Sequence, residues 1–166
     1  MWQGSVVSIH IAPEAGAPLI VVPQVRAIAG QGLEGDRYAT GRGYYSPKPS
    51  LGGREVTLIE MEAVEALAEG VLNAEGERGG IKLNAAQTRR NIATRGVPLN
   101  HLVNTAFRVG EVVLRGTRLC EPCKYLDSLT QPGVMALLVH RGGLRAQIVQ
   151  GGIVRVGDTI KPEETP

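Results

Sequence analysis

The stretch LRAQIVQGGIVRVGDTIK (residues 144–161) contains three short apolar segments separated by glycine turns. Leu144 to Val149 and Ile153 to Val156 have the composition of strands, and Gly151-Gly152 separates them. Gly157-Asp158 then turns the chain into a third strand, Thr159 to Lys161. Short strands joined by such turns predict a β-rich fold.

The same pattern extends toward the N-terminus. Phe107 to Val109 and Val112 to Leu114 predict a hairpin, because Gly110-Glu111 supplies the tight turn between them. Apolar and polar residues alternate from Ser5 to Ile11, which is the period of a half-buried strand, and Val25 to Ile28 predicts another short strand.

Helices are few in this pattern. Apolar residues recur at helical spacing from Glu60 to Leu72, and Gly70 marks the predicted end of that helix. Gly133 to His140 predicts a short helix that ends at Arg141-Gly142-Gly143. A doubly wound sheet needs more helices, so we predict a mostly β fold: one domain over residues 1–166, a β-barrel with a few peripheral α-helices.

Composition limits the function. The 166 residues are 43% hydrophobic and 20% charged, and the net charge of +2 comes from interspersed acidic and basic residues. Binding to nucleic acid normally uses a basic stripe, so no DNA or RNA partner is expected. The longest apolar run, Ala17 to Val22, is too short to cross a bilayer. We therefore expect a soluble, cytoplasmic protein without a membrane partner.

Two loops are candidates for the edge of a site. Glycines at 30, 32 and 35 punctuate a loop that carries Glu34, Asp36 and Arg37, and glycine lets backbone approach a ligand closely. Asp36 and Arg37 are also compatible with an internal ion pair. Residues 40–53 have no periodic pattern and contain two tyrosines, so we expect a surface excursion near the rim of the site.

The motif Cys120-Glu121-Pro122-Cys123 carries the main chemical hypothesis. Pro122 stiffens the loop before Cys123, and a thiolate presented there acts as a nucleophile or as a metal ligand. The alternative is that one or both cysteines are small buried hydrophobic residues. A thioredoxin-like pair is a further alternative, although the expected βαβ setting is missing and Pro132-Gly133 would interrupt the following helix. Structural zinc is disfavoured because no histidine has metal-binding spacing.

The segment Arg89-Arg90-Asn91 is rich in hydrogen-bond donors. Arginine binds phosphate through two parallel hydrogen bonds, and asparagine can hold the edge of a ring. These residues therefore predict an anionic ligand on or beside a strand. The alternative is a solvated edge strand whose arginines discourage pairing.

Four motifs occur together in the order seen in MOSC domains, and the chain resembles that family from about Val6 to Ile160. The four motifs are Gly32-Leu33-Glu34-Gly35-Asp36-Arg37, Arg89-Arg90-Asn91-Ile92, Cys120-Glu121-Pro122-Cys123, and the segment from Gly151 to Asp158.

The resemblance implies a barrel with helices and one cysteine that carries persulfide sulfur or ligates molybdenum. That cysteine matches Cys123, which precedes Lys124-Tyr125-Leu126, and Cys120 is its less certain partner. An Arg-x-Asn pattern that contacts the phosphate side of the pterin matches Arg89 and Asn91. In this hypothesis Arg90 adds positive charge, and Asp36 and Arg37 match a motif whose role is unassigned.

The implied cofactor is the molybdenum cofactor, and an N-hydroxylated compound is the implied substrate of any reduction. The chain has no room for the PLP-dependent desulfurase domain of molybdenum-cofactor sulfurases, so PLP is implied by analogy only. It also lacks the N-terminal barrel domain of the amidoxime reducers. We expect a small-molecule ligand and a separate cysteine desulfurase or cofactor enzyme as partner; the oligomeric state stays open.

Two other functions remain. A thiol-disulfide protein would use both Cys120 and Cys123 in a reversible bond. A non-catalytic module of a cofactor-assembly complex would use neither.

Overall fold

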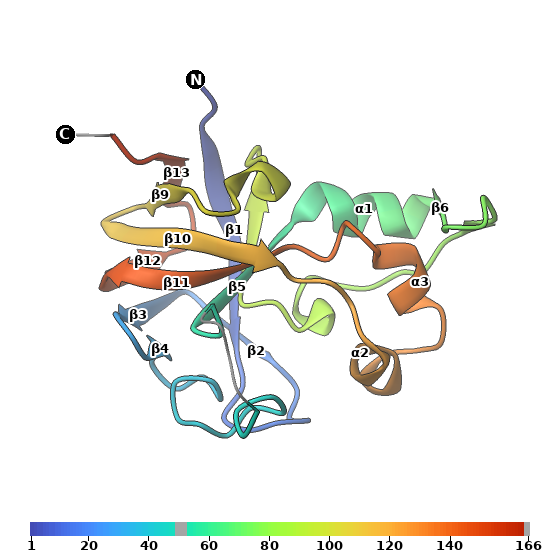
Figure 1. Cartoon of the computed structure of the whole chain (residues 1–166), viewed down its shortest axis with the longest axis horizontal. Helices are drawn as coiled ribbons and strands as arrows, with labels where there is room; N and C mark the ends of the chain where they lie inside the picture. The colour runs from blue at the N-terminus through green and yellow to red at the C-terminus, as the bar shows by residue number, and fades with distance from the viewer. Residues whose placement is uncertain (49–52, 165–166) are drawn as a thin grey trace.

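A closed ring of seven strands forms the centre of the computed structural model, which describes residues 1–48 and 53–164 (Figure 1). The ring strands are β1 (Gly4–Ile11), β5 (Val56–Glu60), β8 (Ile92–Arg95), β9 (Ala106–Val109), β10 (Val112–Leu119), β11 (Leu144–Gln150) and β13 (Thr159–Pro162). Their order around the ring is β13-β9-β10-β11-β5-β8-β1, and β13 pairs again with β1. The predicted β-barrel is therefore confirmed.

Pairing between the first and last strands closes the ring. Gly4 lies opposite Ile160, and the neighbouring strands run antiparallel except for β5 and β8. In that parallel pair Leu58 lies opposite Ile92. Closure satisfies the backbone groups that an open sheet would leave at its edges.

Smaller elements surround the barrel. The strand β2 (Ile20–Val22) extends the sheet beyond β1, and β3 (Gln24–Ile28), β4 (Gly32–Leu33) and β12 (Gly152–Arg155) form a separate small sheet. The helices gather on one side of the barrel (Figure 1). The remaining elements are α1 (Met61–Glu69), β6 (Val71–Leu72), β7 (Arg78–Gly79), the 3-10 turn η1 (Ala86–Thr88), the 3-10 turn η2 (Leu99–Leu102), α2 (Lys124–Leu129) and α3 (Val134–Leu138).

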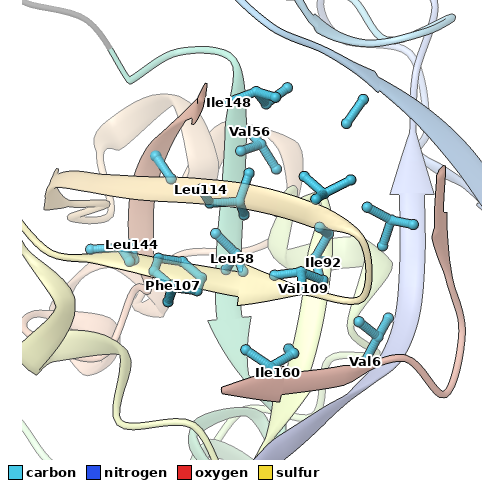
Figure 2. Packing of buried hydrophobic residues seen from close by; sticks show 14 of the residues in the cluster. Val6, Val56, Leu58, Ile92, Phe107, Val109, Leu114, Leu144, Ile148 and Ile160 are labelled. Carbon is cyan, nitrogen blue, oxygen red and sulfur yellow. The ribbon is translucent and has the colours of Figure 1, made fainter. Parts of the chain in front are cut away.

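The main hydrophobic core fills the barrel (Figure 2). Phe107, Leu58 and Ile92 are buried completely within it. Each such side chain contributes about 1.5–3 kcal/mol to stability through burial. A second cluster lies under the helices, where Leu67 of α1 packs with Leu126 of α2 and with α3. Half-buried Cys123 packs against this second cluster, so the helices support the loop that carries the cysteine.

Most predicted elements are confirmed, although β10 continues to Leu119, well past the predicted end at Leu114, and Val71–Leu72, placed in the first predicted helix, forms β6. The helix predicted from Glu60 ends at Glu69, and Gly70 follows it with φ 116°. The hairpin at Gly110 is confirmed as β9 and β10, with φ 57° at that glycine. The short helix predicted from Gly133 is α3.

The short strands β2, β4, β6 and β7 were not predicted, and two larger elements also differ from the sequence expectation. No strand was predicted at β5, because Val56–Ile59 is buried along its whole length and lacks alternation. A helix after Cys123 was disfavoured, yet α2 begins at the next residue and ends at Leu129, before Pro132. The βαβ setting is nevertheless absent from this part of the chain, since β10 and β11 pair antiparallel around α2 and α3. Of the excursion predicted over 40–53, residues 49–52 lie outside the described residues.

None of the helices in the described ranges combines the length and the hydropathy of a membrane-spanning segment.

Candidate functional site

Five of the seven predicted site residues line one cleft. They are Arg37, Arg89, Arg90, Cys120 and Cys123. The cleft encloses about 500 Å³ of space, part of which is open to solvent. Asp36 and Asn91, the other two predicted residues, lie behind its wall.

Cys123 presents its sulfur to this cleft. The residue is half-buried, immediately precedes α2, and is not disulfide-bonded. The hydroxyl of Tyr45 donates a hydrogen bond of 3.1 Å to its Sγ. The alternative that Cys123 is an ordinary core residue therefore accounts for its packing against the second cluster, but not for its hydrogen bond with Tyr45 or its place in the lining of the cleft.

Cys120 is more deeply buried than Cys123, and its backbone is held by hydrogen bonds on both sides. Its side chain is buried, its N–H donates to the carbonyl of Gly143 at 2.8 Å, and its own carbonyl accepts from Arg90. Cys120 contributes to the wall of the cleft but is buried, whereas Cys123 is half-buried. The two cysteines are unbonded in this structure.

The guanidinium of Arg90 ties three backbone segments together. Nε donates to the carbonyl of Gly142 at 2.7 Å, and the two amino groups donate to the carbonyls of Thr88 and Cys120 at 3.2 and 2.8 Å. Arg90 is buried, so these bonds compensate a charge that has lost most of its water. Its charge borders the cleft, while its hydrogen-bond donors hold the cysteine loop in place.

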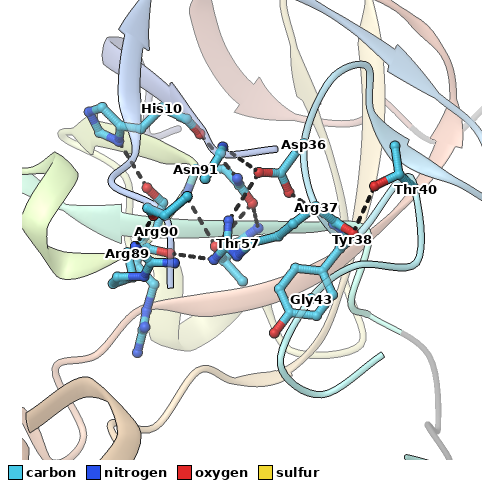
Figure 3. Close-up of polar contacts among 12 residues, drawn as sticks. His10, Asp36, Arg37, Tyr38, Thr40, Gly43, Thr57, Arg89, Arg90 and Asn91 are labelled. Atoms are coloured by element: carbon cyan, nitrogen blue, oxygen red, sulfur yellow. Dashed lines mark hydrogen bonds and ion pairs between the residues drawn. The ribbon is translucent and has the colours of Figure 1, made fainter. Parts of the chain in front are cut away.

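Asn91 lies at the centre of a buried polar network (Figure 3). Its Nδ2 donates to the carbonyl of His10 at 3.1 Å, and its Oδ1 accepts from the backbone and the hydroxyl of Thr57 at 3.0 and 3.2 Å. The Nδ1 of His10 lies 2.8 Å from the carbonyl of Arg90, and burial lowers the pKa of this histidine. We call the side chains of His10, Thr57 and Asn91 the buried network; it joins β1, β5 and the start of β8.

Asp36 and Arg37 form the internal ion pair that the sequence suggested. Their charged groups lie 3.0 Å apart, and Asp36 is completely buried. Asp36 also accepts from the N–H of Ala12, and Arg37 donates to the carbonyl of Arg89 at 3.3 Å. The first two predicted motifs therefore contact each other directly, although Asp36 serves Arg37 and does not reach the cleft.

Arg89 differs from the two residues that follow it. Its backbone adopts the left-handed conformation, with φ 66° and ψ 15°, and its side chain points away from the buried network (Figure 3). One amino group donates to the carbonyl of Ala17 at 2.5 Å. Burial, and then the charge of Arg37, lower the pKa of Arg89 from that of a free arginine. An anion placed here would relieve the repulsion between the two guanidinium groups.

Sequence reasoning did not single out four residues that complete the lining of the cleft, namely Tyr38, Tyr45, Tyr125 and Arg145. Tyr45 contacts the sulfur of Cys123, while the ring of Tyr44 stacks on Tyr125, with centroids 3.9 Å apart and planes 9° apart. Burial, followed by the hydrogen bond to Cys123, raises the pKa of Tyr45. The expectation that the excursion from residue 40 lies near the rim is confirmed for Tyr45.

The lining of the cleft suits an anionic ligand that also binds a thiolate. Four of its residues are arginines, the last being Arg145, and its one acidic residue, Glu121, pairs with His140 outside. Within the described residues no group of three or more His, Cys, Asp or Glu side chains gathers around a common point. A metal held at this cleft would therefore have fewer than three ligands of these types from the described residues.

The comparisons with known proteins place the fold. A family model described as the MOSC domain matches residues 34–161. No curated protein sequence matches the chain. The fold is similar to the crystal structure of the YuaD protein from Bacillus subtilis, with a TM-score of 0.71 and 17% identity, covering 96% of this chain and 97% of that one.

Two YiiM structures are also similar. The protein from Geobacillus stearothermophilus has a TM-score of 0.69 and 14% identity, covering 97% of this chain and 75% of the other. The protein from Escherichia coli has a TM-score of 0.63 and 18% identity, covering 100% of this chain and 71% of the other. Likeness at these identities concerns the fold alone.

Proposed function

Because this chain belongs to the MOSC domain family, we propose that it uses Cys123 to bind the sulfur or the molybdenum of the molybdenum cofactor. One observation carries the proposal: the sulfur of Cys123 faces a cleft with four arginines and one acidic residue in its lining. The thiolate is the reactive form in both roles.

In the sulfur-carrier role, the thiolate of Cys123 attacks the outer sulfur of a persulfide on a cysteine desulfurase. A new S–S bond forms at Cys123, the S–S bond of the donor breaks, and the donor cysteine leaves as a thiolate. The Tyr45 hydroxyl, 3.1 Å from the sulfur, orients it through a hydrogen bond. Arg37 and Arg89 attract the negatively charged acceptor of the sulfur.

In the cofactor-binding role, Cys123 is the ligand of the metal, and Arg37, Arg89 and Arg145 hold the anionic part of the pterin. The bound group supplies oxygen-atom transfer chemistry, for which the family resemblance suggests an N-hydroxylated substrate. Arg90 and Asn91 act indirectly, because their side-chain donors are already used within the protein.

Mass spectrometry after incubation with a cysteine desulfurase and cysteine tests the sulfur role. The wild-type protein should gain one sulfur atom, Cys120→Ala should gain it equally, and Cys123→Ala should gain none. Loss of the sulfur in Cys120→Ala would instead favour a dithiol function.

Metal analysis after expression in a host that makes the cofactor tests the binding role. The wild-type protein should retain molybdenum, and Cys123→Ala should lose it, while Cys120→Ala serves as the matched control. Absence of both sulfur transfer and molybdenum from the wild-type protein would leave the non-catalytic module as the better description.

A further inference from the structure

Residues 40–48, which we call the cover segment, reach across to Cys123 and to the helix that follows it. The hydroxyl of Tyr45 donates to the Sγ of Cys123 at 3.1 Å. The ring of the preceding residue, Tyr44, stacks on Tyr125 of α2, with centroids 3.9 Å apart and planes 9° apart. Two neighbouring side chains of the cover segment therefore bridge to the part of the chain that presents the sulfur.

The cover segment is otherwise anchored mainly through its backbone. None of its residues lies in a helix or a strand, and none belongs to the hydrophobic clusters of the described chain. The carbonyl of Arg42 accepts from the N–H of Ala15 at 3.0 Å, and Arg54 donates to the carbonyls of Tyr45 and Lys48. A segment that contributes no side chain to a hydrophobic core can open locally while the rest of the protein stays folded.

The two tyrosines of the cover segment are coupled to each other. Their rings meet edge to face, with centroids 4.8 Å apart and an interplanar angle of 86°. The ammonium group of Lys48 lies 5.5 Å from the ring centroid of Tyr44 and 5.3 Å from that of Tyr45, within the range of cation–π contact. Because these contacts tie the two rings together, separation of Tyr44 from Tyr125 should also draw the Tyr45 hydroxyl away from Cys123.

The stack is the stronger of the two bridges. Sulfur is a weak hydrogen-bond acceptor, and water can replace the Tyr45 hydroxyl beside a half-buried thiol. Stacked rings gain both from burial of apolar area and from their geometry. Charge does not favour closure, since the cover segment carries Arg42 and Lys48 without an acidic residue and borders a cleft lined by four arginines.

We infer that the stack of Tyr44 on Tyr125 is a latch that holds the cover segment over Cys123, so that opening of the stack controls access to the sulfur. Tyr44 and Tyr125 are positioning residues, because they act on the thiol through Tyr45. The inference goes beyond the proposed function, since it concerns access to the sulfur and not the chemistry performed there. Any molecule that reacts with Cys123, a sulfur donor included, meets the same latch.

The rate of alkylation of Cys123 by iodoacetamide tests the latch in the full chain. Mass spectra of peptide fragments separate modification of Cys123 from modification of Cys120. Tyr44→Ala should raise the initial rate at Cys123 about threefold to tenfold, which corresponds to the strength of one aromatic pair. Tyr44→Phe keeps a ring that can stack, so it should react at the wild-type rate. Equal rates in Tyr44→Ala and Tyr44→Phe would overturn the inference.

Two controls separate local opening from other causes. Leu72→Ala shortens a side chain of similar exposure on β6, outside the lining of the cleft, and should leave the rate unchanged. Global unfolding would expose the buried Cys120 together with Cys123, whereas opening of the latch should spare Cys120. Equal acceleration at both cysteines in Tyr44→Ala, or equal acceleration by Leu72→Ala, would contradict the latch.

The dependence of the rate on pH separates access from reactivity. Only the thiolate reacts, so the midpoint of the pH profile reports ionisation of the thiol and the plateau at high pH reports access. Tyr44→Ala should raise the plateau and leave the midpoint where it is; a moved midpoint with an unchanged plateau would overturn the inference. Tyr45→Phe removes the hydrogen bond but keeps the ring, so it should raise the plateau less than Tyr44→Ala does. A larger rise in Tyr45→Phe would make the hydrogen bond the main restraint and contradict the assigned role of the stack.

Alkylation by iodoacetamide requires neither a sulfur donor nor a metal, so the result is independent of the proposed function. Selective acceleration in Tyr44→Ala, together with a wild-type protein that gains neither sulfur nor molybdenum, would contradict the proposed function alone. Gain of sulfur at Cys123, together with an alkylation rate that Tyr44→Ala leaves unchanged, would contradict this inference alone.

Discussion

Arg89 lies at the rim of the cleft, whereas Arg90 and Asn91, the next two residues, belong to the protein interior. The side chain of Arg89 makes one hydrogen bond, and two of its donor groups are unused within the described residues. Arg90 and Asn91 use their side chains to hold backbone carbonyls, a backbone N–H and a hydroxyl. The comparison teaches that a donor-rich motif can divide into one ligand-binding residue and two that support the fold.

The largest expected effect is at Arg90. Arg90→Gln removes a fork that binds three carbonyls, so the free energy of unfolding should fall by about 3–4 kcal/mol. Urea denaturation measures the change. A loss below about 1 kcal/mol would mean that Arg90, like Arg89, contributes little to the free energy of unfolding, which contradicts the comparison.

Asn91→Ala should have the next largest effect. It leaves the carbonyl of His10 and the donors of Thr57 without partners in the interior, which should cost about 2–3 kcal/mol. Asn100→Ala is the matched control, because Asn100 is exposed and donates one bond to the carbonyl of His140. Equal losses in the two variants would mean that burial does not strengthen the network.

Arg89→Gln should change the free energy of unfolding by less than about 1 kcal/mol, because only one side-chain hydrogen bond is lost. Retention of molybdenum, or the rate of sulfur transfer, should nevertheless fall strongly. The same substitution at two neighbouring arginines therefore separates ligand binding from folding. An Arg89 variant with full molybdenum content and full sulfur transfer contradicts the assigned role.

The smallest effect concerns pH and His10. Burial lowers the pKa of His10 in the folded protein below its ordinary value of 6.5, so the unfolded chain binds more protons just below pH 6.5. This part of the stability is complete above pH 6.5 and is lost as the pH falls toward the lowered pKa. His10→Asn should remove that dependence, and His101→Asn, at an exposed position, should retain it. Parallel denaturation series at several pH values measure the difference.

The barrel could be predicted because its turns are indicated by the local sequence. Gly110, Gly151-Gly152 and Gly157 separate short apolar segments, and the strands lie between them as expected. β5 was missed because buried strands lack alternation, and a run of apolar residues does not by itself distinguish a strand from a helix.

The residue types that form the site could be predicted, but the directions in which their side chains point could not. Cys123, Arg37 and Arg89 face one cleft, whereas the left-handed backbone at Arg89 turns the chain so that Asn91 faces the interior. Nothing local in the sequence indicates that turn, because non-glycine residues rarely adopt it. The contact of Tyr45 with Cys123 spans 78 positions along the chain and depends on the whole barrel.

The pairing of β13 with β1 has a consequence for synthesis. The pairing of β1 with β13 can form only after β13 has been synthesised, since Gly4 pairs with Ile160. Contacts this distant in sequence give a high contact order and slow folding. Until then the edges of β1 and β9 stay open to other chains, so we expect nascent or truncated chains lacking β13 to depend on chaperones.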